Sequence, residues 1–302
     1  MPLVDFTNLD FDQIKESIKD YIRSNSNFTD YDFDGSNLST IIDVLAYNTY
    51  INSYNANMLA NEVFIDSATL RENVVSLARN VGYVPRSAKS STTEVTFSID
   101  ISGLSVNPIS LTLQEGVVAK ASTSVQSFVF STPDPITAPI IDDIAYFQDI
   151  KLYEGTLVKK YFTVDANNPN QRFILDNPSI DTSSIRVFVR PTETSTIRKR
   201  FNLSESIFEI NNTSKVFFIQ EIEDERYELI FGDGIIGEKL ENLNYIEVSY
   251  IVTNGEDGNG ISSLDYMGRV IDDNGNVING DVSLLLLAGQ TYGGAEIETV
   301  ES

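Results

Sequence analysis

This chain of 302 residues contains no cysteine and no histidine. Without cysteine there are no disulfides, no thiolate nucleophile and no cysteine-ligated zinc or iron–sulfur cluster. Without histidine there is no imidazole base and no histidine metal ligand, so most hydrolase mechanisms lose their usual groups. Carboxylate chemistry and oxygen-ligated cations remain. Nothing marks one pair among the 44 acidic residues as catalytic, so we expect no enzyme, no bound metal and no cofactor.

Basic residues are scarce relative to acidic ones. The chain has 21 Lys and Arg against 44 Asp and Glu, which gives a net charge of −23. This charge repels nucleic acids and anionic membranes, so neither is an expected partner, and a basic neighbouring protein fits better. Long apolar runs are also missing: none approaches the ~18 residues that span a bilayer, and the first residues lack a secretory pattern. We expect a protein made and kept in a cytoplasm.

Residues 1–86 are predicted to form a helical assembly region. Behind a candidate cap at Asn8 or Asp10, a first helix carries an apolar stripe of Phe11, Ile14, Ile18 and Ile22. Ser36 is placed to cap a second helix, from Leu38 to Leu59. The apolar face and the tyrosines of that helix comprise Leu38, Ile41, Ile42, Leu45, Tyr47, Tyr50 and Tyr54. A helix rich in asparagine and tyrosine is unusual on a free surface, so it is either buried with its amides satisfied inside the domain or packed against partner chains.

Residues 87–260 are predicted to form a large, mainly antiparallel β-rich body, which makes the fold class α+β. Apolar residues alternate along several short segments, with a candidate division into two subdomains near residue 143. Within residues 225–259, alternation predicts two strands that pair as a β-hairpin around a glycine-rich turn. The turn residues are Phe231, Gly232, Asp233, Gly234 and Gly237. A phosphate cradle is disfavoured there, because no strand-to-helix transition and no Walker lysine follow.

Two polar segments and the C-terminal region complete the pattern. Asp272 to Asn276 begins like a calcium loop but lacks the required glycine and bidentate glutamate, so a hairpin turn around Asn274 and Gly275 is favoured. The basic cluster of Arg190 and residues 198–200 is either a solvated face or a salt-bridged contact to another subunit. Residues 261–302 are predicted to be a linker and the start of a C-terminal domain that is cut short.

Several of these segments carry a resemblance to a known family. They are Asp30 to Ser36, Leu45 to Thr49, Leu70 to Pro85, Phe231 to Gly237, Tyr245 to Val252 and Asn254 to Gly260. Together they span most of the chain and resemble the baseplate wedge subunits of T-even-type contractile phage tails, in the J-like baseplate protein family. The resemblance places subunit packing on the first two helices and a fold-defining role on the glycine-rich turn.

The resemblance also implies a function. It implies a structural virion protein: an inner-ring wedge subunit that links wedges around the hub and transmits the trigger for sheath contraction. The implied partners are other copies of the chain, other wedge proteins and, as further candidates, hub and sheath-initiating proteins. The implied location is the tail baseplate of the virion, after assembly in the bacterial host cytoplasm. The alternative is a saccharide- or receptor-binding β module of a tail or adhesion structure, although the chain has no Trp for a sugar platform.

Overall fold

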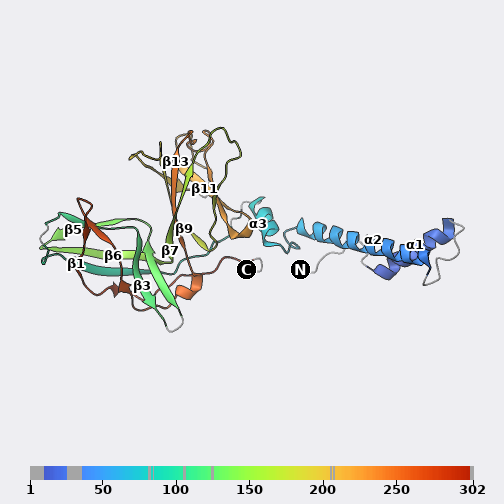
Figure 1. The fold of residues 1–302 in the computed structure, drawn as a ribbon, viewed down its shortest axis with the longest axis horizontal. Coiled ribbons are helices and arrows are strands. Elements are labelled where there is room, and N and C mark those ends of the chain that lie inside the picture. The colour runs from blue at the N-terminus through green and yellow to red at the C-terminus, as the bar shows by residue number, and fades with distance from the viewer. Residues whose placement is uncertain are drawn as a thin grey trace. The chain divides into compact units, whose positions relative to one another are not determined.

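The structure is a computed structural model that describes residues 10–25, 36–80, 83, 85–104, 107–123, 126–204, 206 and 208–299. The chain divides into two units, residues 1–84 with 299–302 and residues 85–298. The first is helical and the second is built from two mainly antiparallel sheets, which confirms the predicted α+β class (Figure 1). None of the helices in the described ranges is long and apolar enough to span a bilayer.

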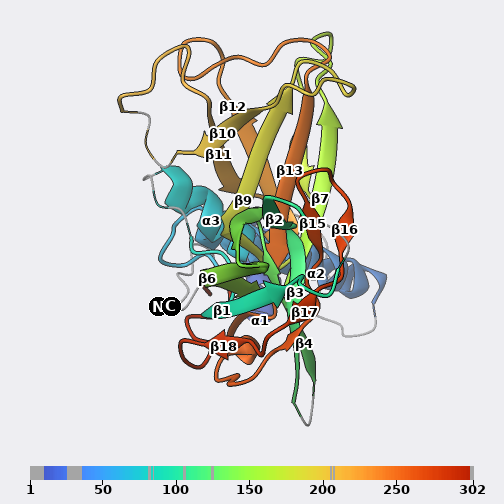
Figure 2. The same ribbon diagram turned by 90° about the vertical axis from the view of Figure 1, so that its left-hand side faces the viewer.

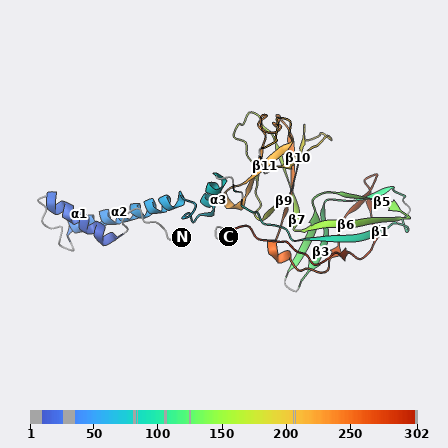
Figure 3. The same cartoon turned by 180° about the vertical axis from the view of Figure 1, so that it is seen from behind.

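The helical unit contains α1 (Phe11–Asn25), α2 (Asn37–Glu62) and α3 (Arg71–Asn80). The predicted caps are present: the Asp10 carboxylate accepts hydrogen bonds from the backbone N–H groups of residues 12 and 13, and the Ser36 hydroxyl accepts one from Ser39. Helix α1 lies alongside α2, and an ion pair of 2.6 Å joins Lys15 to Asp43 (Figures 1 and 3). The apolar stripe of α1 therefore has a neighbour within its own unit.

The first sheet takes strands from both ends of the second unit. Its strands are β1 (Thr92–Asp100), β2 (Ser110–Leu113), β3 (Gly116–Ser122), β4 (Ser127–Thr132), β5 (Ile136–Ile141), β6 (Ile144–Glu154), β14 (Asp265–Tyr266), β15 (Val270–Asp272), β16 (Val277–Ile278), β17 (Asp281–Val282) and β18 (Leu286–Leu287). Alternate residues of β1 are buried in its core, where the rings of Phe97 and Phe147 stack with centroids 5.0 Å apart. The linker predicted from residue 261 onward is wrong, because β14, β15, β17 and β18 pair with β1, β2 and β3, and β16 pairs with β15, so that they complete this sheet.

The second sheet occupies residues 156–252. Its strands are β7 (Thr156–Thr163), β8 (Phe173–Leu175), β9 (Ile180–Arg190), β10 (Lys199–Leu203), β11 (Val216–Glu221), β12 (Tyr227–Phe231) and β13 (Tyr245–Val252), in the spatial order β7-β13-β9-β10-β11-β12-β8. The two faces predicted in residues 225–259 are confirmed, because their apolar residues lie in or against one core cluster, although β13 is buried on both of its faces. The predicted hairpin is wrong: three strands separate β12 from β13. Short 3-10 turns lie at Glu223–Glu225 and Gly255–Gly258.

The second sheet is thus an insertion in the first. Strand β6 pairs with β1, β4 and β5 of the first sheet, while β7 pairs with β13 of the second. The change of sheet falls at Gly155 and not near residue 143, because β6 is still needed as the partner of β1. Figure 2 shows the second sheet rising from the first, with its loops gathered at the far end.

The entry and exit of this insertion are joined by one buried carboxylate. Glu154 is the last residue of β6, directly before the change of sheet at Gly155, and is 0% exposed. It accepts hydrogen bonds from the Thr253 hydroxyl at 2.7 Å and from the backbone and side-chain nitrogens of Asn254 at 3.0 and 2.6 Å. Three donors offset the loss of water around the buried carboxylate. Their bonds hold together the two points at which the chain enters and leaves the second sheet.

Ion pairs add a second link between the sheets. Lys159 on β7 lies 2.5 Å from Glu115, in the turn between β2 and β3. Arg186 on β9 lies 2.9 Å from Asp134, which follows β4. These side chains are only partly exposed, so solvent screens the pairs less than at a free surface.

We expect Glu154→Ala to lower the free energy of unfolding of the sheets by about 1–3 kcal/mol, because it removes the acceptor of the buried Thr253 hydroxyl and of two donors of Asn254. Glu94→Ala is the matched control, since Glu94 is an exposed carboxylate on β1, and it should stay within about 0.5 kcal/mol of the unchanged chain. Urea unfolding followed by circular dichroism measures both. Equal effects of the two substitutions would contradict the role given to Glu154.

Candidate protein–protein interface

Helix α2 presents a long apolar surface without charge. From Val44 to Asn61 it has no charged residue, although the whole chain carries a net charge of −23. The large apolar side chains exposed on α2 are Ile41, Val44, Leu45, Tyr47, Tyr54, Met58 and Leu59, with exposed fractions between 41% and 71%. Three more follow directly in the turn after α2, namely Val63, Phe64 and Ile65. Such a concentration of exposed apolar side chains marks an interaction site more often than apolar residues that are exposed singly.

The predicted interface residues divide into three groups. Ile41, Leu45, Tyr47 and Tyr54 are exposed. Half-buried are Phe11, Ile14, Ile18, Ile22, Leu38 and Tyr50. Ile42 is 1% exposed, so its assignment to a partner contact is wrong: the helical unit itself covers it. Sequence reasoning missed Val44, Met58 and Leu59, for which the absence of charge along the helix was the available signal.

The asparagines of α2 fit both interpretations of this helix. Asn57 and Asn61 are buried, and the Asn61 side chain donates to the Asn57 carbonyl at 2.8 Å. Asn48 and Asn52 are exposed and bond to each other at 2.8 Å. The C-terminal end of α2 is therefore satisfied within the unit, while its middle turns present amides outward.

Glu62 ties the end of α2 to α3. Its carboxylate accepts hydrogen bonds from the Asn73 side chain at 2.7 Å and from the Thr69 hydroxyl and backbone N–H. These bonds, that from Asn73 first, lower the pKa of Glu62 to about 2. The connection between the two helices is accordingly ordered by side-chain contacts.

The predicted glycine-rich turn follows β12 and is held by hydrogen bonds and a close backbone contact within the turn itself. The Asp233 carboxylate accepts hydrogen bonds from the backbone N–H groups of Ile235 and Ile236 at 2.8 and 2.9 Å. Gly232 passes so close to Gly237 that an added Cβ would lie 2.4 Å from the carbonyl carbon, which excludes any other residue there. Gly234 and Gly237 both have positive φ. The turn is anchored to the loop before β11, because Gly237 donates to the Asn211 carbonyl at 3.0 Å.

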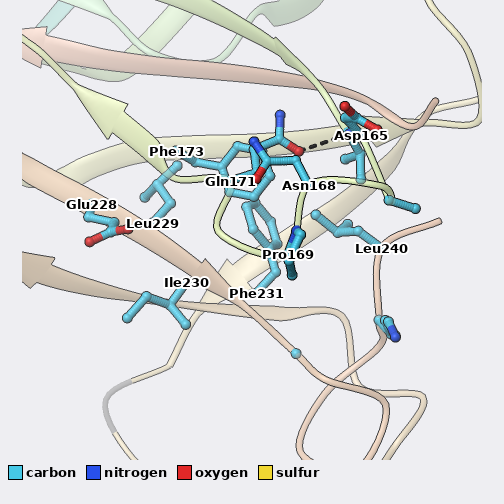
Figure 4. Close-up of a pocket in the computed structure, with 14 residues that line it drawn as sticks. Asp165, Asn168, Pro169, Gln171, Phe173, Glu228, Leu229, Ile230, Phe231 and Leu240 are labelled. Carbon is cyan, nitrogen blue, oxygen red and sulfur yellow. Dashed lines mark hydrogen bonds between the residues drawn. The ribbon is translucent and has the colours of Figure 1, made fainter. Parts of the chain in front are cut away.

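A pocket of about 500 Å³ lies beside this turn (Figure 4). The rings of Phe173 and Phe231 meet edge to face in it, with centroids 5.4 Å apart, and Leu240 completes the apolar part. The loop between β7 and β8 supplies the polar part, with Asn168 and Gln171. The Gln171 side chain is already used: it donates to the Thr163 carbonyl at 2.7 Å and accepts from the Asp165 N–H at 2.8 Å.

The two polar segments singled out in the sequence are held by contacts within the chain. Strands β15 and β16 form the predicted hairpin, and Asp272 accepts bonds from the N–H groups of Asn274 and Asn276 at 2.9 and 2.7 Å. Each member of the basic cluster lies near a carboxylate: Arg190 and Arg198 near Glu247, Lys199 near Glu238 and Arg200 near Asp134. In the described ranges no three Asp or Glu side chains gather in a group able to hold a metal ion. A contact of this cluster with another subunit stays a prediction.

Two domain models of one protein family match the chain. The model described as baseplate wedge protein gp6-like, helical domain, matches residues 10–83. The model described as bacteriophage baseplate wedge protein gp6, third domain, matches residues 158–255, which is the inserted sheet. The two matches together cover more than half of the chain.

The chain belongs to the gp6-like family of baseplate wedge proteins. It is 29% identical over 273 residues to baseplate wedge protein gp6 of Enterobacteria phage T4. That alignment covers 85% of this chain and 40% of the relative, so the chain spans about two fifths of the relative's length. The resemblance to baseplate wedge subunits is confirmed, and its J-like part stays a prediction.

The turn of this wedge-family chain is expected to depend on pH through Asp233. Hydrogen bonds from Ile236 and then Ile235 lower the pKa of Asp233 below its ordinary value of 3.8. Because the folded pKa is depressed, the stability that Asp233 gives is present above pH 3.8 and is lost as the pH falls through the lower folded pKa. The amide NMR signals of Ile235 and Ile236 should therefore titrate with a midpoint below 3.8. Asp233→Ala should abolish this transition, and a midpoint at or above 3.8 would refute the turn's hydrogen bonding.

Proposed function

We propose that this chain is a structural, non-catalytic subunit of a contractile-tail baseplate wedge. In this role it lies in the inner ring of the virion's baseplate, links wedges around the hub and transmits the trigger for sheath contraction. Its partners are other copies of itself and other wedge proteins, with hub and sheath-initiating proteins as further candidates. Assembly takes place in the bacterial host cytoplasm. Membership in the wedge family supports this proposal.

The uncharged face of α2 is the observation that carries the proposal. A helix exposed to water in an acidic chain is expected to carry Glu and Lys, which solvate it and form helix-stabilising pairs. Helix α2 instead exposes Val44, Leu45 and Tyr47 within one turn. Burying such a face in a bundle of subunits removes apolar area from water at about 25 cal/mol per Å². This face contributes no charged side chain between Val44 and Asn61. Two acidic subunits can therefore pack there without charge repulsion inside the contact.

The way in which the two sheets are joined suits a subunit that transmits a conformational change. The carboxylate of Glu154 and the pairs Lys159–Glu115 and Arg186–Asp134 join them at several points. A unit joined in this way moves as one body, and the change of state then lies in contacts between subunits that have two arrangements. This supports a role in transmission in which each subunit stays rigid.

The saccharide- or receptor-binding alternative depends on the pocket of the second sheet. A sugar site needs polar groups that are free to bond the ligand's hydroxyls. In this pocket the Gln171 amide bonds within its own loop, and the Asn168 side-chain oxygen accepts from the Asn170 N–H at 3.1 Å. These two amide side chains are thus used to shape the loop, and they do not favour this alternative.

Leu45→Glu tests the proposal, because it places a charge in the middle of the α2 face at a side chain that is 50% exposed. We expect the full chain to stay folded and its incorporation into tails to fall at least tenfold. The readout is the number of complete baseplates seen by electron microscopy when the variant replaces the unchanged protein in the phage that encodes it. Ser17→Glu is the matched control, since Ser17 is exposed on α1 and outside the face. Normal baseplates with Leu45→Glu would overturn the proposal.

A further inference from the structure

Two arginines of the second sheet have guanidinium groups that make no hydrogen bond to the described part of the chain. Arg198 directly precedes β10 and Arg200 lies on it, with side chains that are 41% and 50% exposed. In contrast, Arg172, Arg186 and Arg190 around the same sheet each donate to a carboxylate. A guanidinium group carries five N–H donors. The donors of Arg198 and Arg200 are therefore open to a group from outside the chain.

The two carboxylates within 4.0 Å of these arginines already have closer partners. Arg198 lies 3.9 Å from Glu247, to which another arginine donates a hydrogen bond. Arg200 lies 4.0 Å from Asp134, which accepts a bond of 2.9 Å from another arginine. The loop between β9 and β10 supplies a third acid, Glu193, which lies within 4.0 Å of neither arginine. Distances near 4 Å are too long for hydrogen bonds, so the chain's own acids leave both guanidinium groups unsaturated.

An aromatic ring orients the first of these arginines. The guanidinium carbon of Arg198 lies 4.1 Å from the centroid of the Phe188 ring on β9. Phe188 pairs with Arg200 across the two strands, so the ring and both arginines share one face of the sheet. The opposite face is the core side, where Phe201 is buried. A guanidinium group stacked on a ring keeps its N–H edge open and loses little conformational freedom when it binds.

This chemistry selects an anionic group, because the guanidinium fork matches the geometry of a carboxylate or a phosphate. Nucleic acid carries a charge at every phosphate, so it would also lie against the acidic surface of a chain with a net charge of −23. A protein surface can instead present one or two carboxylates at the arginines and uncharged or basic groups around them. The observations therefore favour a protein carboxylate over a nucleic-acid phosphate.

We propose that Arg198 and Arg200 bind carboxylate side chains of a neighbouring protein subunit. Each guanidinium group donates to a partner carboxylate, and Phe188 holds the first arginine in position. The inference rests on the proposed function, because the neighbour is a subunit of the same baseplate. It adds to the uncharged face of α2 a second contact of opposite character, made by charge-assisted hydrogen bonds on the second sheet.

Replacing both arginines, Arg198→Gln with Arg200→Gln, tests this contact in the phage that encodes the chain. We expect the plaque titre to fall roughly tenfold or more, while the purified full chain unfolds at an unchanged temperature. The matched control is Lys120→Gln with Lys215→Gln, which removes the same charge at two exposed lysines and should keep the titre. An unchanged titre, an equal loss in the control or a lowered unfolding temperature would overturn the proposal.

Charge reversal identifies the partner group. Phages carrying Arg198→Glu with Arg200→Glu are passaged, and revertants that keep both changes are sequenced. We expect an Asp or Glu of another subunit to be replaced by Lys or Arg. Suppressors confined to Glu247 and Asp134 would overturn the proposal, because the arginines would then serve the ion pairs of their own sheet.

A nucleic-acid partner and a failure of the proposed function have separate readouts. Binding of a single-stranded DNA or RNA oligonucleotide by the purified full chain, lost with Arg198→Gln and Arg200→Gln, would overturn the proposal in favour of a phosphate. Normal baseplates with the two glutamines and defective ones with Leu45→Glu would overturn this inference and keep the proposed function. The reverse pattern would support this contact and overturn the role of α2.

Discussion

A single buried carboxylate determines how the two sheets of this chain are joined. Glu154 is the last residue of β6, and Thr253 and Asn254 are the first residues after the inserted sheet. The bonds between them close a segment of roughly one hundred residues at its base, where chain entropy opposes the contact. Because all three bonds end on one buried carboxylate, the contact is lost as a whole and not bond by bond. This closure and the ion pairs Lys159–Glu115 and Arg186–Asp134 together join the inserted sheet to the first.

Local signals in the sequence predicted the helices and strands, but they did not predict which distant strands pair. Asp10 and Ser36 cap their helices because a cap needs only residues two or three positions away. Asn274 and Gly275 form their hairpin for the same reason. Alternation along β12 and β13 gave the correct faces but not the neighbours, since a period of two identifies a buried side and not the strand beside it. The insertion was missed because β17 and β18 return to pair with β1 across roughly 190 residues.

The candidate interface shows a similar limit. An apolar pattern defined the face of α2, yet Ile41 is exposed and the adjacent Ile42 is buried. Adjacent residues on a helix point about 100° apart, so the line between core and free surface depends on where α1 lies. The position of α1 against α2 is known only from the folded helical unit. The missing charges between Val44 and Asn61 were visible in the sequence and extend the face beyond its predicted residues.

The order in which the ribosome delivers these strands differs from the order in which they pair. Val95 on β1 pairs with Leu287 on β18, which is made roughly 190 residues later. At about 5–20 residues per second, the outer edge of β1 waits roughly 10–40 s for its partners. The inserted sheet is contiguous and is complete before them. The nascent chain thus carries one finished sheet beside one with an open edge, and open edges recruit other strands. Protection of that edge during synthesis becomes a requirement of this topology.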